Sequence, residues 1–109
     1  MQVKIYISGP ISNDPYHRES FGKAEEYLKH LGYDIVNPLN IQEKEFSGPD
    51  KEIKLWNYFM RKSIRLLMGC DQIYMLENWE ESRGARIEHQ LATDLSMPRM
   101  YEEEDIEYV

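Results

Sequence analysis

The sequence predicts one α/β domain in which helices cover both faces of a parallel β-sheet. Short apolar runs typical of buried strands alternate with longer segments whose apolar residues recur at helical spacing. Glycine and proline separate these segments. The 109 residues suffice for one ordinary core but leave no room for a second domain. We therefore expect a single domain over residues 1–109, with right-handed crossovers between its strands.

The first part of the chain predicts a strand, a helix and a second strand. Residues 3–8 are rich in β-branched and aromatic side chains, which is typical of a buried strand. The helix should begin at Asp14-Pro15, an N-cap followed by a proline, and end at about residue 30 or 31. Residues 33–36 then form the second strand.

The rest of the chain repeats this alternation. After a polar loop over residues 39–50, the pattern predicts a helix over 50–68, a strand over 72–76, a helix over 82–95 and a strand over 97–101. Six apolar side chains of the long helix should share one face: Ile53, Trp56, Phe59, Met60, Ile64 and Leu67. The acidic end of the chain is either a frayed tail or an arm that contacts a neighbouring subunit.

Charge and composition narrow the possible partners. The net charge is −7 and the pI about 4.9, so a nucleic-acid polymer is a poor partner, because binding its backbone requires clustered lysine and arginine. A single phosphate can still be held by backbone N–H groups at the start of a helix. No apolar run is long enough to cross a bilayer, so we expect no membrane association and a cytoplasmic location.

The sequence gives no sign of a metal or cofactor. One cysteine allows neither an intramolecular disulfide nor a cysteine-based metal cluster. The three histidines are too scattered in helix position to predict a metal site.

Polar side chains follow the first and third predicted strands, where parallel α/β sheets bind ligands. Tyr6 and Ser8 alternate along the first strand and so share a face. Ser82 can cap the third helix or meet an anion there. Glu88 has small or apolar neighbours three and four residues away, so its carboxylate can lie beside a space. The alternative is an ordinary capped helix with a half-exposed glutamate.

Two further residues of this segment admit both a binding role and a packing role. Trp79 could stack on a base, although an aromatic in such a turn more often packs against its neighbours. Gly84 costs the helix about 1 kcal/mol relative to alanine, which fits a ligand or strand that approaches the backbone closely. The loop after the first strand, residues 9–12, lacks the full glycine pattern of the common phosphate-binding motifs.

Four ordered motifs together resemble the nucleoside 2-deoxyribosyltransferase-like superfamily, in particular its small phage and bacterial members. They are Lys4–Ser12, Val36–Pro38, Cys70–Leu76 and Trp79–Glu88. The resemblance implies a flavodoxin-like three-layer sandwich, with helices flanking a parallel sheet of four to five strands. It also implies a homo-oligomer, dimer or higher, with shared active sites. The implied activity is cleavage of the N-glycosidic bond of a nucleoside or (deoxy)nucleoside 5′-monophosphate, with no cofactor.

The resemblance also assigns roles to individual residues. Glu88 matches the glutamate that attacks the anomeric carbon, and Tyr6 matches the tyrosine that orients it. Ser82 matches a position that is serine in nucleotide hydrolases, where it helps to hold the 5′-phosphate, and aspartate in the transferases. With the positions argued above, the expected substrate-binding set is Ser8, Gly9, Pro10, Ile11, Ser12, Asn37, Trp79, Ser82 and Gly84.

One position departs from the family pattern. Where the family has an aspartate that protonates or orients the departing base, this chain has Ser63. Helical spacing predicts that Ser63 points inwards with Met60 and Leu67, but a serine cannot serve as an acid. Loss of a general acid typically lowers a rate by about 10²- to 10⁴-fold. Glu77 or Glu80 could substitute, although both are more typical of surface carboxylates.

The leading hypothesis is therefore a retaining glycosyl transfer through Glu88, as hydrolase or 2-deoxyribosyltransferase. A second hypothesis is a catalytically weak or inactive nucleotide-binding or regulatory module, motivated by Ser63. A third is an α/β scaffold that binds no ligand and assembles through its acidic end. The base, and ribose against deoxyribose, stay open at this point.

Overall fold

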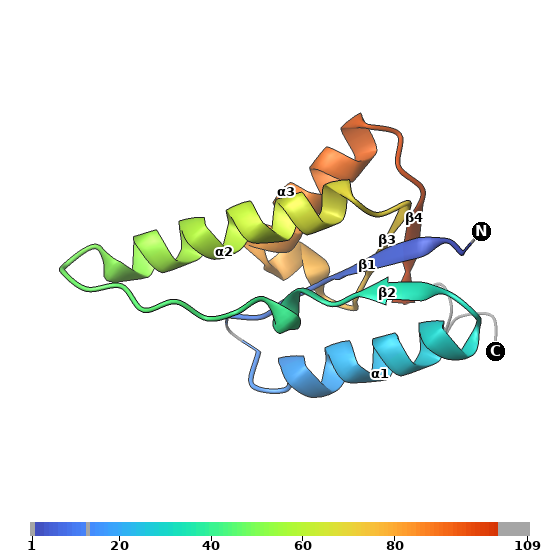
Figure 1. Ribbon diagram of the computed structural model, residues 1–109, viewed down its shortest axis with the longest axis horizontal. Coiled ribbons are helices and arrows are strands. Elements are labelled where there is room, and N and C mark those ends of the chain that lie inside the picture. Colours follow the sequence, from blue (N-terminus) through green and yellow to red (C-terminus); the bar gives the residue numbers. More distant parts are fainter. Residues whose placement is uncertain (1, 13, 103–109) are drawn as a thin grey trace.

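The chain folds around a sheet of four parallel strands in the order β2-β1-β3-β4 (Figure 1). This computed structural model describes residues 2–12 and 14–102, so most of the predicted acidic end lies outside the described residues. The strands are β1 (Lys4–Ser8), β2 (Asp34–Val36), β3 (Gln72–Met75) and β4 (Arg99–Tyr101). The predicted parallel sheet is confirmed.

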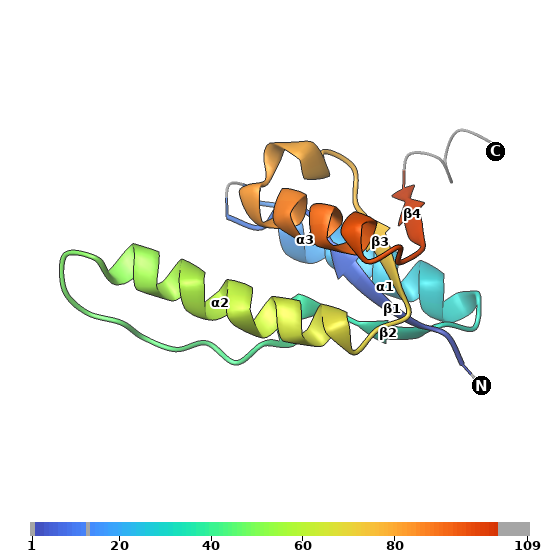
Figure 2. The same ribbon diagram turned by 90° about the horizontal axis from the view of Figure 1, so that it is seen from above.

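Helices cover both faces of this sheet, which confirms the expected three-layer, flavodoxin-like sandwich. Helix α1 (His17–His30) lies on one face, and α2 (Lys51–Met68) and α3 (Arg83–Asp94) lie side by side on the other (Figures 1 and 2). Two short 3₁₀ turns, η1 (Pro38–Asn40) and η2 (Trp79–Glu81), follow β2 and β3.

The alternation of side chains along the central strands builds two separate cores. Ile5 and Ile7 of β1 pack with Phe21 and Leu28 of α1, whereas Tyr6 faces the opposite core, which includes Leu67 and Ala85 of the other two helices. Successive strand residues point to opposite faces, so residues 6 and 8 are directed to the side covered by α2 and α3. Because of this alternation, the hydroxyl groups of Tyr6 and Ser8 on β1 lie next to helix α3.

Helix α1 begins later than predicted. It starts at His17 and not at Asp14-Pro15, and its N-cap residue, Tyr16, makes no side-chain capping bond. The Asp14 carboxylate instead accepts a hydrogen bond of 2.8 Å from the Tyr16 N–H, which closes a local turn before the helix. The predicted end of this helix, at residue 30 or 31, is confirmed.

The predicted apolar face of α2 is buried only in its C-terminal half. Met60, Ser63 and Leu67 are buried there, whereas Ile53 is 65% exposed. An 18-residue helix is about 27 Å long, while the five residues of β1 span about 17 Å. The N-terminal half of α2 therefore projects beyond the sheet, as Figures 1 and 2 show.

Candidate active site

The Glu88 carboxylate lies beside the end of β1 and is held by two hydroxyl groups. Tyr6 donates a hydrogen bond of 2.6 Å to Glu88 Oε2, and Ser8 donates one of 2.6 Å to Oε1. Only 5% of Glu88 is exposed, and within residues 2–12 and 14–102 no lysine, arginine or histidine forms an ion pair with it. The expected pairing of Tyr6 with Glu88 is therefore present, and the half-exposed surface glutamate is excluded.

Burial changes the acidity of this carboxyl group. Desolvation raises the pKa of Glu88 from its ordinary value of 4.5 to about 7, against the smaller lowering effect of the bonds from Ser8 and Tyr6. Desolvation also raises the pKa of the Tyr6 phenol well above its ordinary range, and the nearby Glu88 carboxylate raises it further. At neutral pH the tyrosine thus remains a donor, while Glu88 is poised between its acid and its carboxylate form.

Helix α3 is anchored by its first turn, which fixes the position of Glu88. As predicted, Ser82 caps this helix, and its Oγ accepts a hydrogen bond of 3.2 Å from the Ala85 N–H. Gly84 allows α2 to approach, because a Cβ atom there would lie 2.9 Å from Met60 Sδ. The close neighbour of Gly84 is therefore a methionine of this chain, which gives the glycine a packing role.

The loop after β1 is held against the end of β3. A Cβ atom at Gly9 would lie 2.8 Å from two Leu76 side-chain atoms, so only glycine fits this approach without a shift. Beyond it, Pro10 and Ile11 are partly buried, and Ile11 packs on the core beneath α1. Ser12 is exposed. Contact of these residues with a substrate stays a prediction.

Asn37, another expected substrate-binding residue, is used within the fold. Its Oδ1 accepts a hydrogen bond of 2.9 Å from the Leu39 N–H, which caps η1, and its Nδ2 donates one of 3.2 Å to Glu25 Oε1. Both ends of the amide therefore have partners in this structure.

Ser63 faces inwards as predicted, and its surroundings are unusual. The residue is fully buried, and its Oγ is the only buried side-chain nitrogen or oxygen in the described chain without a hydrogen-bond partner. Its hydroxyl is close enough to Tyr6 to lower the pKa of that phenol slightly, although the geometry falls short of a hydrogen bond. A buried polar group left in this way usually has a specific reason.

Trp79 belongs to an aromatic cluster that the sequence did not reveal. Its ring stacks on that of His89 with centroids 4.1 Å apart, and His89 Nε2 lies 2.8 Å from the Tyr101 hydroxyl. Desolvation, with a smaller contribution from Arg99, lowers the pKa of His89. The only sequence signal was the position of His89, directly after the candidate glutamate. The face of Trp79 that meets His89 is not free to stack on a base.

Two shallow, open hollows lie elsewhere on the described chain. One of about 420 Å³ lies along α2, and one of about 340 Å³ lies along α1, and Glu88 lines neither. Within residues 2–12 and 14–102 no three histidine, cysteine, aspartate or glutamate side chains are grouped to hold a metal ion. In the same part of the chain, no helix combines the length and apolarity needed to span a membrane.

The three layers and the parallel strand order place the chain in the flavodoxin-like α/β class. Residues 3–101 match the family described as "Domain of unknown function (DUF4406)", and the chain belongs to that family. No curated protein matches the chain.

Two solved structures share this fold. A 2-deoxyribosyltransferase from Bacillus psychrosaccharolyticus superposes with a TM-score of 0.68 at 21% sequence identity, over 91% of this chain and 71% of that protein. A conserved protein from Enterococcus faecalis V583 gives a TM-score of 0.61 at 15% identity, over 93% of this chain and 63% of that protein. The predicted resemblance to the nucleoside 2-deoxyribosyltransferase-like superfamily is thereby confirmed for the fold.

Proposed function

We propose that this protein cleaves the N-glycosidic bond of a nucleoside or (deoxy)nucleoside 5′-monophosphate, with Glu88 as the nucleophile. One observation carries the proposal: a buried carboxylate at the carboxyl ends of the strands, held through both oxygens and paired with no cation of the described chain. Two hydroxyl donors fix the position of this carboxylate, and its oxygens keep further lone pairs free for attack.

The reaction proceeds in two displacements. A Glu88 oxygen forms a bond to C1′ while the C1′–N bond breaks, and the base leaves with that electron pair. Water, or a second base, then attacks C1′ and releases the carboxylate, so the configuration is retained. Because Ser63 is no acid, the departing base takes its proton from solvent, and cleavage is slow. Hydrolysis and transfer differ only in the acceptor of this second step.

Ser82 favours a substrate that carries a 5′-phosphate. Its hydroxyl lies at the N-terminus of α3. The N–H groups of Ala85 and Arg86 there already bond to Ser82. The N–H groups of Arg83 and Gly84 are therefore the ones proposed to meet a phosphate. A partner subunit is proposed to supply one wall of the site, and neither of the two shallow hollows described above includes Glu88. The proposed state is thus a homo-oligomer with shared sites, acting on a small molecule in the cytoplasm.

The Ser63 hydroxyl supports a second candidate, a nucleotide-binding or regulatory module that has lost the chemistry. The α2 side of the site holds a buried group without a partner where an acid would be needed. Such a protein would bind nucleotides and release no base. Binding by calorimetry, with no free base after a long incubation, would favour it over the enzyme.

The decisive experiment follows free base by chromatography while the protein is incubated with a panel of nucleosides and nucleoside monophosphates. We expect slow release from at least one compound, reduced by roughly 10³-fold or more in Glu88→Ala, because the nucleophile is lost. Glu26→Ala, an exposed glutamate of α1 on the other face of the sheet, is the matched control and should retain activity. Release that is unchanged in Glu88→Ala would reject the proposal.

A further inference from the structure

A second region of the molecule concentrates positive charge in an otherwise acidic chain. The hollow of about 420 Å³ lies between the loop before α2 and the outer side of that helix. Five of the chain's 13 lysines and arginines line it: Lys44, Lys54, Arg61, Lys62 and Arg65. We call this region the α2 groove. It lies apart from Glu88, which is not among its lining residues.

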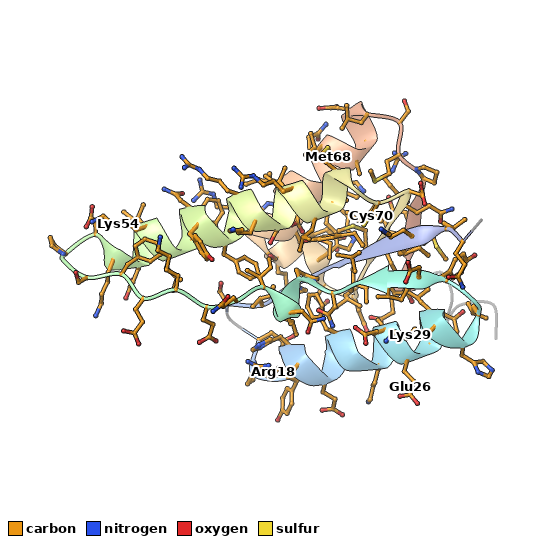
Figure 3. The ribbon with its side chains drawn as sticks, in the orientation of Figure 1. Arg18, Glu26, Lys29, Lys54, Met68 and Cys70 are labelled. Atoms are coloured by element: carbon orange, nitrogen blue, oxygen red, sulfur yellow. The ribbon has the colours of Figure 1, made fainter. Side chains whose placement is uncertain are left out.

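Helical spacing aligns most of these cations. Lys54, Arg61 and Arg65, with Lys62 beside them, recur at intervals of three to four residues or their multiples, so they share one side of α2. They extend over about 17 Å of helix. Figure 3 labels Lys54 on the projecting part of this helix, while Arg18 is labelled on α1 across the sheet. The groove is therefore an extended basic stripe.

Two aromatic rings attach the loop to the helix and place the lysines. The Phe46 and Tyr58 rings meet edge to face with centroids 5.9 Å apart, and the Tyr58 hydroxyl donates a hydrogen bond of 3.3 Å to the Gln42 carbonyl. Lys44 Nζ lies 5.3 Å from the centre of the Phe46 ring, and Lys62 Nζ lies 5.6 Å from that of Tyr58. These cation–π contacts hold both ammonium groups at the groove.

Most of the cations in the groove form no ion pair with a carboxylate of the described residues. Lys54 pairs with Asp50 at 3.2 Å, but within residues 2–12 and 14–102 the other four form no ion pair. Like charges along one side of a helix repel each other, and a concave surface focuses their field. An anion bound there would remove this repulsion.

We propose that the α2 groove binds a small linear polyphosphate, either inorganic or as the triphosphate of a nucleotide. Several phosphates in a row match a stripe of several cations better than one phosphate does. A nucleic-acid polymer fits less well, because the remainder of this acidic chain would repel it. The rings of Phe46 and Tyr58 also contact each other and the lysines, so they offer little free surface for stacked bases.

The test is isothermal titration of the full chain with inorganic tripolyphosphate, which has neither the sugar nor the base that the Glu88 site would need. We expect binding at about 0.1 M salt that is largely lost at about 1 M, where charges are screened within about 3 Å. Arg61→Gln with Lys62→Gln should weaken binding at least about tenfold, because two attractive charges are lost. The control variant, Arg18→Gln with Lys23→Gln, removes the same charge from α1. It should change the affinity for tripolyphosphate less than about twofold.

Further ligands and the oligomeric state distinguish the alternatives. A nucleoside triphosphate that binds through the groove should be weakened by the same double substitution. The proposal is overturned by inorganic phosphate that binds as tightly as tripolyphosphate, by equal weakening in the control pair, or by tighter binding of a single-stranded oligonucleotide. It is also overturned if sedimentation shows that Arg61→Gln with Lys62→Gln dissociates an oligomer, since the groove would then be an interface between copies.

Discussion

Helices α2 and α3 each place a buried polar side chain near β1, and the two side chains differ in whether they have hydrogen-bond partners. On the α3 side, both Glu88 oxygens accept hydrogen bonds of 2.6 Å from groups on β1. On the α2 side, the Ser63 hydroxyl is fully buried and has no partner. Hydrogen bonds to a charged group contribute about 1.5–3 kcal/mol each, whereas an unsatisfied buried group costs about 1–3 kcal/mol. The buried polar group on the α3 side therefore has a hydrogen-bond donor at each oxygen, whereas the one on the α2 side has no partner.

This difference corresponds to the two halves of the proposed reaction. In that proposal, the α3 side would position the group that attacks the sugar, and the α2 side is where the departing base would receive its proton. Tyr6 contacts both sides. Its hydroxyl donates a hydrogen bond to Glu88, and the nearby Ser63 hydroxyl lowers the pKa of its phenol. A chain with this asymmetry should bind its substrate yet cleave the glycosidic bond slowly, because attack on C1′ and departure of the base occur in the same step.

The largest expected effect comes from completing the α2 side. In Ser63→Asp a carboxyl group replaces the unpartnered hydroxyl, and burial should raise its pKa so that it can donate a proton at neutral pH. We expect base release to increase by about 10²-fold or more, within the range of general-acid catalysis. The initial rate of base release by chromatography measures it.

Ser63→Asn provides the matched control, because an amide has nearly the shape of the carboxyl group but donates no proton to a leaving base. It should leave the rate within about threefold of the wild type. Thermal unfolding of both variants checks that they fold. An equal increase in both would show that the gain comes from packing or polarity, and the assignment of the α2 side to the leaving group would then be wrong.

The next effect concerns how the α3 side responds to pH. Glu88 has a pKa of about 7 in the folded chain, against its ordinary value of 4.5, so between these values the folded protein holds a proton that the unfolded chain has released. This contribution to stability is fully present below about pH 4.5 and is lost as the pH rises to about 7. The free energy of unfolding should fall by about 3 kcal/mol over this window.

Glu88→Gln cannot ionise, so it should lack this part of the pH dependence and be more stable than the wild type at about pH 8. Urea unfolding of both proteins at about pH 5 and about pH 8 measures the difference. Parallel profiles would mean that Glu88 ionises in the folded chain as easily as in the unfolded one. The contrast between the two sides would then lose its electrostatic basis.

The sequence predicted the fold well because strands and helices leave periodic signals. The alternation of Ile5, Tyr6, Ile7 and Ser8 defined both faces of β1, and the structure places these residues accordingly. The sequence pattern gave less information about where side chains bond to the local backbone and about how far a helix extends beyond the sheet. The Asp14 carboxylate accepts a hydrogen bond within a turn before α1, so this helix starts later than predicted. Helix α2 is longer than the sheet beneath it, so Ile53 stays exposed.

Within the candidate site, the contact between Tyr6 and Glu88 was expected from the family resemblance. Tyr6 and Glu88 were expected as a pair, but the hydrogen bond from Ser8 depends on how close α3 comes to β1, which spacing alone does not give. The α2 groove was not predicted, because the net charge of the whole chain is negative and does not reveal a local cluster of lysine and arginine side chains. Its signal was present in the spacing of Lys54, Arg61 and Arg65.

The smallest expected effect tests the residue that joins the two sides. Tyr6→Phe removes a hydrogen bond that lowers the pKa of Glu88, so the carboxyl group should ionise at a higher pH. At neutral pH we expect kcat/KM for base release to fall about tenfold, with the rate recovering as the pH is raised. Tyr33 is partly buried against the core beneath α1, away from Glu88, so Tyr33→Phe should leave the pH profile unchanged. A loss that is uniform across pH would show that Tyr6 acts through packing alone, because only a shift of the profile reports a change in the ionisation of Glu88.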